Sequence, residues 1–145
     1  MYVISNVNDD FVKCKDEQAF KKLYCNLRLR QKGTVTSVQK LVCIETEETV
    51  AGFPDVMELT TFCGRTTAVF YEFKISDRYG NIEFQPSQPA FYKNNYELKI
   101  TVVAYNKKSQ RVHVFSASEI FDKNSPYYTT NRRINLTKAE KEIGV

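Results

Sequence analysis

The chain has 145 residues, the usual length of one domain, and its 42% hydrophobic and 26% charged residues are typical of a folded protein rather than a disordered one. No apolar run reaches the roughly 18 residues that a membrane helix needs, and the first residues do not resemble a secretory signal. We therefore expect one domain over residues 1–145, with no membrane partner and a cytoplasmic location.

The cysteines give no sign of a metal site. Cys14, Cys25, Cys43 and Cys63 lie 11, 18 and 20 positions apart, so that no C-x-x-C pair occurs and zinc would need an unusual spacing. We expect free thiols, as in a reducing cytoplasm, and neither a metal nor another cofactor.

The charges are unevenly spread along the chain. The whole chain carries +4, whereas residues 13–32 carry a net +5, residues 45–83 a net −5 and residues 93–145 a net +5. Such asymmetry can mark a surface that binds a polyanion, although a mixed, solvated surface is the commoner cause.

A short first strand near residues 2–7 precedes a predicted helix over about residues 16–31. The apolar residues of this helix recur at the spacing of one helical face. They are Phe20, Leu23, Tyr24 and Leu27. Asp16 is a candidate cap and Gly33 a natural stop. Residues 34–44 predict a strand, residues 45–54 an acidic loop, and residues 56–62 a further strand.

Residues 67–76 alternate with a period of two and predict a strand, which a polar turn at residues 76–81 follows. The alternation resumes at Ile82 and Phe84. A hairpin that pairs Phe73 with Phe84 and Ile75 with Ile82 would place Lys74 opposite Glu83. Residues 85–95 contain two prolines and predict a connection rather than a central strand.

A second hairpin is predicted over residues 97–116, closed by a polar five-residue loop at 106–110. In the expected register, the pairs on one face are Tyr105 with Arg111, Val103 with His113 and Thr101 with Phe115. Those on the other face are Ala104 with Val112 and Val102 with Val114. One register thus accounts for both faces.

The end of the chain predicts two short helices. Residues 116–119 and 137–140 both have the spacing of a capping box, which predicts one helix through Phe121 and another that Gly144 ends. The segment 124–145 is short and charged, and we expect it to pack loosely. The predicted fold class is α+β: an antiparallel sheet built from hairpins, with one principal helix packed on it and a short C-terminal helical tail.

No pattern indicates a catalytic centre. His113 is the one histidine, and no companion motif supports a triad, a P-loop or a dinucleotide site. Glu45, Glu47 and Glu48 are typical of a solvated loop. A nuclease would need clustered carboxylates for its metal ions, and the spacing of the acids locates none. We therefore expect that the chain is not an enzyme.

The second face of the 97–116 hairpin mixes basic and aromatic residues, which neutralise phosphates and stack on unpaired bases. With the downstream arginines it forms the candidate nucleic-acid site. Its members are Lys99, Tyr105, Lys107, Lys108, Arg111, His113, Phe115, Arg132 and Arg133. The predicted partner is single-stranded RNA or DNA, bound with little sequence specificity. In the competing interpretation, Val103, Tyr105 and Phe115 pack under the helix.

An alternative function is a protein-interaction or assembly module, including a homo-oligomer, that uses aromatic residues. These residues are Phe70, Tyr79, Phe91, Tyr92, Tyr96, Tyr127 and Tyr128. Frequent Asn, Lys and Tyr without Trp suit an AT-rich genome such as that of a phage, which would make the chain a viral protein in a host cytoplasm.

Overall fold

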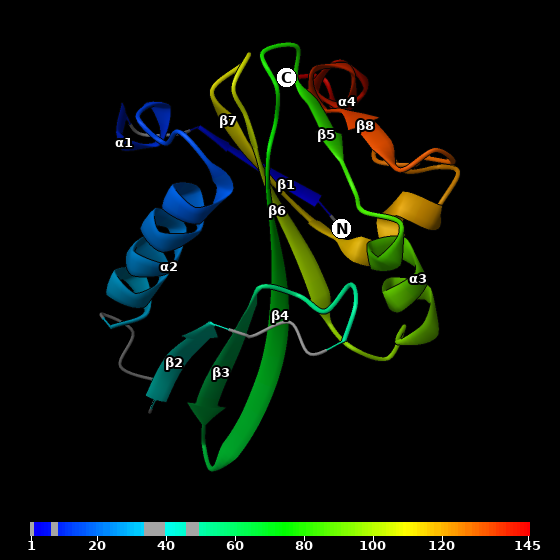
Figure 1. Ribbon diagram of the computed structural model, residues 1–145. Coiled ribbons are helices and arrows are strands. Elements are labelled where there is room, and N and C mark those ends of the chain that lie inside the picture. Colours follow the sequence, from blue (N-terminus) through cyan, green and yellow to red (C-terminus); the bar gives the residue numbers. More distant parts are fainter. Residues whose placement is uncertain (1, 7–8, 34–39, 46–49) are drawn as a thin grey trace.

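The computed structural model describes residues 2–6, 9–33, 40–45 and 50–145, and its centre is a six-stranded sheet (Figure 1). The strands are β1 (Tyr2–Asn6), β2 (Lys40–Glu45), β3 (Val56–Phe62), β4 (Arg65–Ile75), β6 (Ile100–Asn106) and β7 (Arg111–Ser116), in the order β1-β7-β6-β4-β3-β2. Neighbouring strands are antiparallel except β4 and β6, which are parallel.

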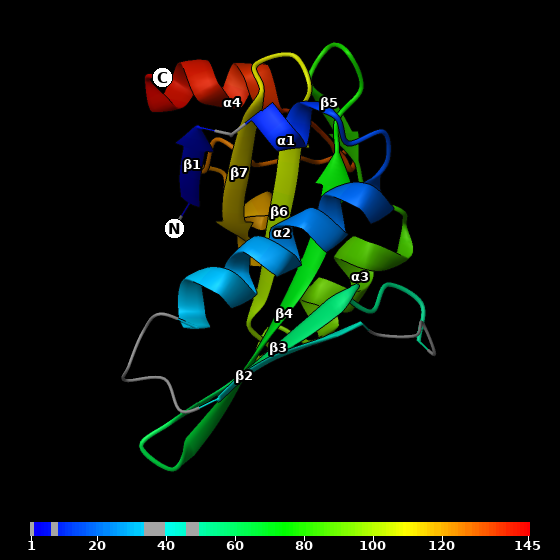
Figure 2. The same cartoon turned by 90° about the vertical axis from the view of Figure 1, so that its left-hand side faces the viewer.

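Helices cover both faces of this sheet. They are α1 (Asp9–Val12), α2 (Glu17–Gly33), α3 (Ser87–Asn94), η1 (Ala117–Phe121) and α4 (Leu136–Ile143). Helix α2 lies on one face, while α3, α4 and the small sheet of β5 (Asn81–Glu83) and β8 (Arg133–Asn135) lie on the other (Figures 1 and 2). The α+β class and the short C-terminal helix are confirmed. None of the described helices has the length and apolarity needed to cross a bilayer.

The α2 layer agrees with the sequence pattern. Asp16 Oδ1 accepts a hydrogen bond from the Ala19 backbone N–H at 2.8 Å, so Asp16 caps the helix as expected. The predicted stripe packs on the sheet: Phe20 is fully buried, with its ring 5.9 Å from that of Phe73 and 5.7 Å from that of Tyr105. Aromatic packing on β4 and β6 therefore holds this helix.

The opposite layer includes the C-terminal segment, and the expectation that residues 124–145 pack loosely is wrong. Tyr127, Ile134, Leu136 and Ala139 are each at most 4% exposed and share one core cluster with β6 and β7. Helix α4 begins two residues earlier than the capping-box spacing indicates. Asn135 is the cap, whose Oδ1 accepts from the Lys138 N–H at 2.8 Å, and Gly144 ends the helix with φ +94°.

The expected pairing of Phe73 with Phe84 and of Ile75 with Ile82 is also wrong. Strand β6 occupies one edge of β4 along Phe70–Ile75, and β5 pairs with β8 instead. Because β4 and β6 run parallel, the chain must cross over between them. The connection predicted at residues 85–95 contains α3, and Pro86 precedes the first turn of this helix, where no backbone donor is needed.

The β6–β7 hairpin exists, but its register differs by one residue from the prediction. Tyr105 lies opposite Val112 and Ala104 opposite His113, and the loop between the strands has four residues, with Gln110 at φ +60°. A shift of one residue moves one strand's side chains to the other face. Phe115 therefore joins the cluster beneath α4, while Tyr105 joins the cluster beneath α2.

The strand predicted at 56–62 is confirmed as β3, and the strand predicted at 34–44 appears as β2 in its described portion. Residues 34–39, and Glu47 and Glu48 of the acidic loop, lie outside the described residues.

Candidate functional site

The predicted binding face does not form one surface. Tyr105, His113 and Phe115 are 2%, 0% and 1% exposed, so none of these rings can stack on a base. Lys99, Lys107, Lys108 and Arg133 are exposed, and Arg111 and Arg132 are half-buried. The competing interpretation is correct for Val103 and Tyr105, which pack in the cluster beneath α2, whereas Phe115 packs on the other face of the sheet, in the cluster beneath α4.

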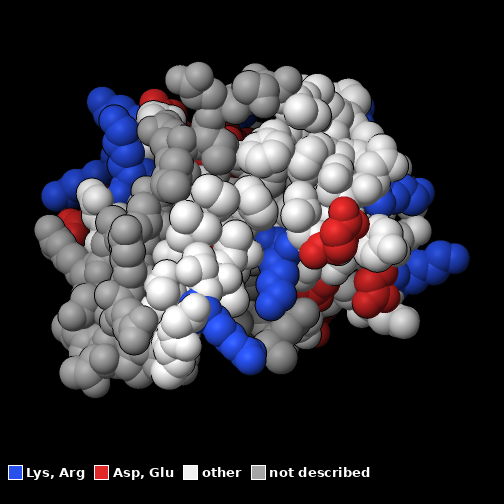
Figure 3. Space-filling model, turned by 90° about the horizontal axis from the view of Figure 1, so that it is seen from below, with Lys and Arg blue, Asp and Glu red and all other residues white. Residues whose placement is uncertain are grey.

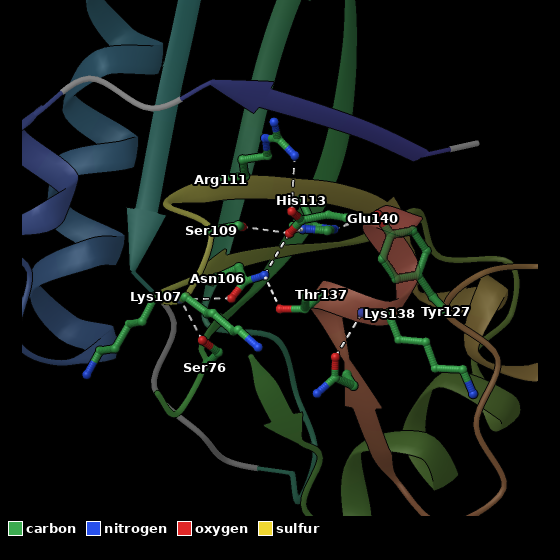
Figure 4. Close-up of polar contacts among 12 residues, drawn as sticks. Ser76, Asn106, Lys107, Ser109, Arg111, His113, Tyr127, Thr137, Lys138 and Glu140 are labelled. Carbon is green, nitrogen blue, oxygen red and sulfur yellow. Dashed lines mark hydrogen bonds and ion pairs between the residues drawn. The ribbon is translucent and has the colours of Figure 1, made fainter. Parts of the chain in front are cut away.

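His113 belongs to a buried polar network that joins α4 to the hairpin (Figure 4). Glu140 Oε2 of α4 accepts from Asn106 Nδ2 at 2.6 Å and from Ser109 Oγ at 2.7 Å, and it lies 2.8 Å from His113 Nε2. Arg111 bonds the other carboxylate oxygen at 3.2 Å. Both oxygens of Glu140 are thus bonded within the fold.

The electrostatics of this network indicate a structural role. Burial lowers the pKa of His113 despite the neighbouring carboxylate, so the ring is neutral at pH 7. Burial would raise the pKa of Glu140, but hydrogen bonds from Ser109, His113 and Asn106 outweigh it and lower the pKa. His113 Nδ1 lies 2.8 Å from the Tyr127 hydroxyl. Because the polar atoms of this network are bonded to one another and His113 and Glu140 are buried, the network stabilises the packing of α4 and presents no reactive group.

A second set of polar residues gathers at an open edge of β4. Strand β3 begins at Val56, opposite Tyr71, so that no described strand lies beside the last four residues of β4 on that edge. Amides two residues apart point to the same edge of a strand. The Phe73 N–H donates to Asp55 Oδ2 at 3.1 Å, and the Ile75 N–H donates to the Glu17 carboxylate. Two carboxylates thus occupy the place of the missing strand.

Glu72 and Lys74 alternate with these two amides and project toward α3. Both are buried, at 3% and 6% exposed, and Lys74 Nζ lies 3.8 Å from Glu72 Oε1. Gln88, in the first turn of α3, accepts from Lys74 Nζ at 2.9 Å and donates to Glu72 Oε1 at 2.5 Å. The Phe84 ring lies beneath the ammonium group, 5.2 Å from Nζ to the ring centroid.

We call Glu17, Asp55, Glu72, Lys74 and Gln88 the acid–lysine site. Burial, together with the charges of Asp55 and Glu17, raises the pKa of Glu72 to about 8 against the opposing effects of Lys74 and the hydrogen bond from Gln88. Burial also raises the pKa of Glu17, whose carboxylate is partly shielded although the residue reaches the surface. Mutual repulsion among the carboxylates shows that they share one small region.

Among the described residues, two buried oxygens at or beside this site have no hydrogen-bond partner, Glu72 Oε2 and the Tyr92 hydroxyl. Burial, and then the charge of Glu72, raises the pKa of Tyr92. An unpartnered buried carboxylate oxygen costs free energy and is a common sign of a ligand or ion that binds there.

Carboxylate oxygens are the ligands that Mg²⁺ prefers. Within the described part of the chain, no three His, Cys, Asp or Glu side chains converge closely enough to enclose a metal ion. Mg²⁺ does not need such a cage, because it commonly binds one or two carboxylates and completes its shell with waters and substrate phosphates. Asp55 and Glu72, with the free oxygen of Glu72, fit that mode.

Sequence reasoning missed this site because its members come from four separate segments. One signal was present: Glu72 and Lys74 alternate within residues 68–75, whose other members are all apolar. On a sheet covered on both faces, such charges are buried and need a special reason. On a half-exposed sheet the same pattern is an ordinary solvated face.

The surface charges are mixed on the face seen from below, where basic and acidic side chains lie among uncharged ones (Figure 3). Of the seven aromatic residues of the interaction hypothesis, Tyr92 and Tyr127 are buried, whereas Tyr79 and Tyr96 are exposed. No protein-family model and no curated protein sequence matches the chain.

Proposed function

We propose that this protein hydrolyses phosphodiester bonds of nucleic acids with the help of a divalent metal ion, and that the acid–lysine site carries out the reaction. One observation carries the proposal: Asp55, Glu72 and Lys74 meet at the open edge of β4, and a buried oxygen of Glu72 has no partner in the part of the chain that the structure describes. Clustered carboxylates are the feature that a nuclease needs.

Each residue has a role that its position supports. Asp55 and Glu72 would hold the metal ion, which supplies a Lewis acid for the phosphoryl oxygen and lowers the pKa of a bound water. Lys74, held by Gln88, places a positive charge where negative charge develops on the phosphate. Glu17, at the surface, is placed to accept a proton from the water. The oxygen of water forms the new bond to phosphorus as the bond from phosphorus to the leaving oxygen breaks, and the leaving oxygen takes up a proton from solvent.

Nucleic acid remains the proposed partner because the chain is basic, with a pI near 8.8, and keeps exposed lysines at Lys99, Lys107 and Lys108. The expectation that the chain is not an enzyme rested on the lack of a catalytic motif and, for a nuclease, on the lack of clustered carboxylates in the sequence. A non-enzymatic binder stays the alternative, in which the same surface binds a strand without cutting it. A reducing compartment such as the cytoplasm is also proposed, and the free thiols of Cys14, Cys25 and Cys63 support it.

A cleavage assay tests the proposal. The purified chain is incubated with supercoiled DNA, single-stranded DNA and single-stranded RNA, with Mg²⁺, with Mn²⁺ or with EDTA. We expect cleavage of at least one substrate with metal and none with EDTA. Glu72→Gln and Lys74→Met should each lower the rate by about 100-fold or more, because each removes a group that acts on the transition state.

The matched controls are Glu97→Gln and Lys141→Ala, which remove an exposed acid and an exposed base outside the site. Both should cleave at the rate of the original chain. Circular dichroism of each variant separates loss of chemistry from loss of fold. No cleavage of any substrate, or cleavage that survives both site variants, would overturn the proposal.

A further inference from the structure

An open cavity of about 360 Å³ lies between the end of α3, the start of β6 and η1. Figure 1 shows α3 on the side of the sheet away from α2, and η1 packs beside α3. We call this cavity the aromatic pocket. Its lining includes Tyr92, Lys93, Tyr96, Lys99, Ile100 and Phe121. A cavity of this size that combines aromatic walls with a few polar groups is typical of a site for a small organic group.

The aromatic pocket adjoins the acid–lysine site through two side-chain contacts and one helix. The Tyr92 ring, in the wall of the pocket, lies 6.1 Å from the Phe84 ring between centroids. The Phe84 ring in turn lies 5.2 Å from Lys74 Nζ. Tyr92 also stands one turn of α3 after Gln88, whose side chain accepts a hydrogen bond from Lys74. One wall of the pocket is therefore packed against the residues that hold Lys74.

The pairing of β4 with β6 gives the same placement independently. Ile100, in the wall of the aromatic pocket, lies opposite Phe70 of β4. Two residues further along, Val102 lies opposite Glu72, and Ile100 and Val102 share one core cluster. Side chains two residues apart on a strand point to the same face and lie roughly 7 Å apart. The pocket and Glu72 are thus neighbours on the α3 face of the sheet, at a spacing that one nucleotide of a strand can bridge.

The side chains of the aromatic pocket fit an unpaired nucleotide. Tyr96 and Phe121 are 85% and 39% exposed, so aromatic faces reach solvent there, and every base has a flat face that can stack on such a ring. Lys93 and Lys99 are exposed and outnumber Glu97, the one acid among the described lining residues. Lys93 Nζ lies 5.8 Å from the centroid of the Phe121 ring, so a positive charge and an aromatic ring occur at one place.

We infer that the aromatic pocket holds an unpaired base of the strand that the acid–lysine site cuts, with its lysines on an adjoining phosphate. This inference rests on the proposed function and deepens it, because it selects the kind of strand. A base in a duplex must leave its stack before it can enter a pocket, at a cost in free energy. Single strands should therefore be better substrates than duplexes. Because every base can stack, the sequence of the strand should matter little.

Fluorescence polarisation of a labelled single-stranded DNA hexamer, in EDTA so that no cleavage occurs, tests the inference. Tyr96→Ala should bind the hexamer at least about fivefold more weakly, because the stacking of a base on the ring is lost. Tyr96→Phe keeps the ring and should keep the affinity. A second hexamer, with the same phosphates but no bases, should bind Tyr96→Ala and the original chain equally. Because Tyr96 is 85% exposed, its substitution leaves the core intact.

Tyr79→Ala is the matched control. Tyr79 is also an exposed tyrosine, but it lies in the turn between β4 and β5 and does not line the aromatic pocket. Its replacement should leave the affinity for both hexamers unchanged. Lys99→Gln should instead weaken the binding of both hexamers by the same factor, because this lysine contacts phosphate and not a base. The two hexamers thus separate base contacts from phosphate contacts.

Cleavage kinetics complete the test. With metal, Tyr96→Ala should raise KM for a single strand, leave kcat unchanged and narrow the preference for single strands over duplexes. Unchanged affinity of Tyr96→Ala for the hexamer with bases, an equal loss on both hexamers, a comparable loss in Tyr79→Ala, or no binding by the original chain overturns the inference, whether or not the chain cleaves. Binding of bases that depends on Tyr96 without any cleavage instead overturns the proposed function and supports the pocket as the base site of a strand-binding protein.

Discussion

Glu72 is the residue at which folding and the proposed function oppose each other. Its carboxyl is 3% exposed, beside Asp55 and Glu17, and its pKa is raised from 4.5 to about 8. The folded state therefore prefers the neutral form, while a metal ion requires the carboxylate. Polar groups that are poorly satisfied in the fold are a common feature of sites that bind ligands.

We predict that the free energy of unfolding falls as pH rises from about 4.5 to about 8. Below 4.5 the carboxyl is protonated in both states and has no effect; above 8 the folded state bears the full cost of ionising it. The Glu72→Gln variant should lack this pH dependence. At pH 9 its free energy of unfolding should exceed that of the original chain by roughly a few kcal/mol. Urea unfolding at pH 5, 7 and 9 measures it. Equal pH profiles for the two proteins would contradict the prediction.

Metal binding should show the opposite pH dependence. Because Glu72 must lose its proton to become a ligand, Mn²⁺ affinity should rise from pH 6.5 to pH 8.5, with proton release on binding. Calorimetry in buffers of different ionisation enthalpy measures both quantities. Glu72→Gln should bind more weakly and without that proton release; an unchanged titration in this variant would place the metal elsewhere.

At the scale of elements, Glu140 is the main polar link between α4 and the β6–β7 hairpin. Glu140→Ala would leave His113, Asn106 and Ser109 without their shared acceptor. We expect a loss of about 2–4 kcal/mol of unfolding free energy, because buried groups lose their partner. Glu142→Ala, on the exposed side of α4, should change it by less than about 0.5 kcal/mol. Denaturant titrations measure the free energy of unfolding of both variants, and an equal loss in the two would show that the network adds no stability.

The loop before β3 sets the position of Asp55, and Gly52 fixes that loop against α3. Gly52 has φ +86°, and an added Cβ would collide with the Ser87 carbonyl oxygen and lie 2.9 Å from Phe91 Cβ. Gly52→Ala should therefore displace the loop and lower cleavage. Gly64→Ala is the matched control, with φ +76° and open space around it, so it should lose some stability and keep activity. The cleavage rates and melting temperatures of both variants test this prediction, and full activity in the Gly52→Ala variant would contradict it.

Sequence patterns predicted the elements better than their pairing. The stripe around Phe20 identified α2 because one face of that helix is exposed. Strand β6 gave no such contrast: residues 102–105 are all buried, so apolar residues occur on both faces and two registers fit equally well. The acid–lysine site was not predicted from the sequence for a related reason. Asp55 and Glu72 are 17 positions apart, and only the pairing of β3 with β4 brings them together.

At the scale of the molecule, both layers depend on the same central strands. Helix α4 and Tyr127 cover the side of β6 and β7 opposite α2. We predict that deleting residues 136–145 abolishes cooperative unfolding, because it exposes the cluster that contains Leu136 and Ala139, which are at most 1% exposed. Thermal melts followed by circular dichroism measure it. A cooperative transition near that of the original chain would show that this helix is dispensable.

The parallel pairing of β4 with β6 also sets the order in which the molecule becomes functional. A nascent chain that has reached residue 95 already carries all five side chains of the acid–lysine site. It still lacks β6, which begins at Ile100 and supports the whole length of β4 that bears Glu72 and Lys74. Pairings between distant segments form late. On the proposed function, a nascent chain that ends before β6 would therefore lack the strand that supports the site.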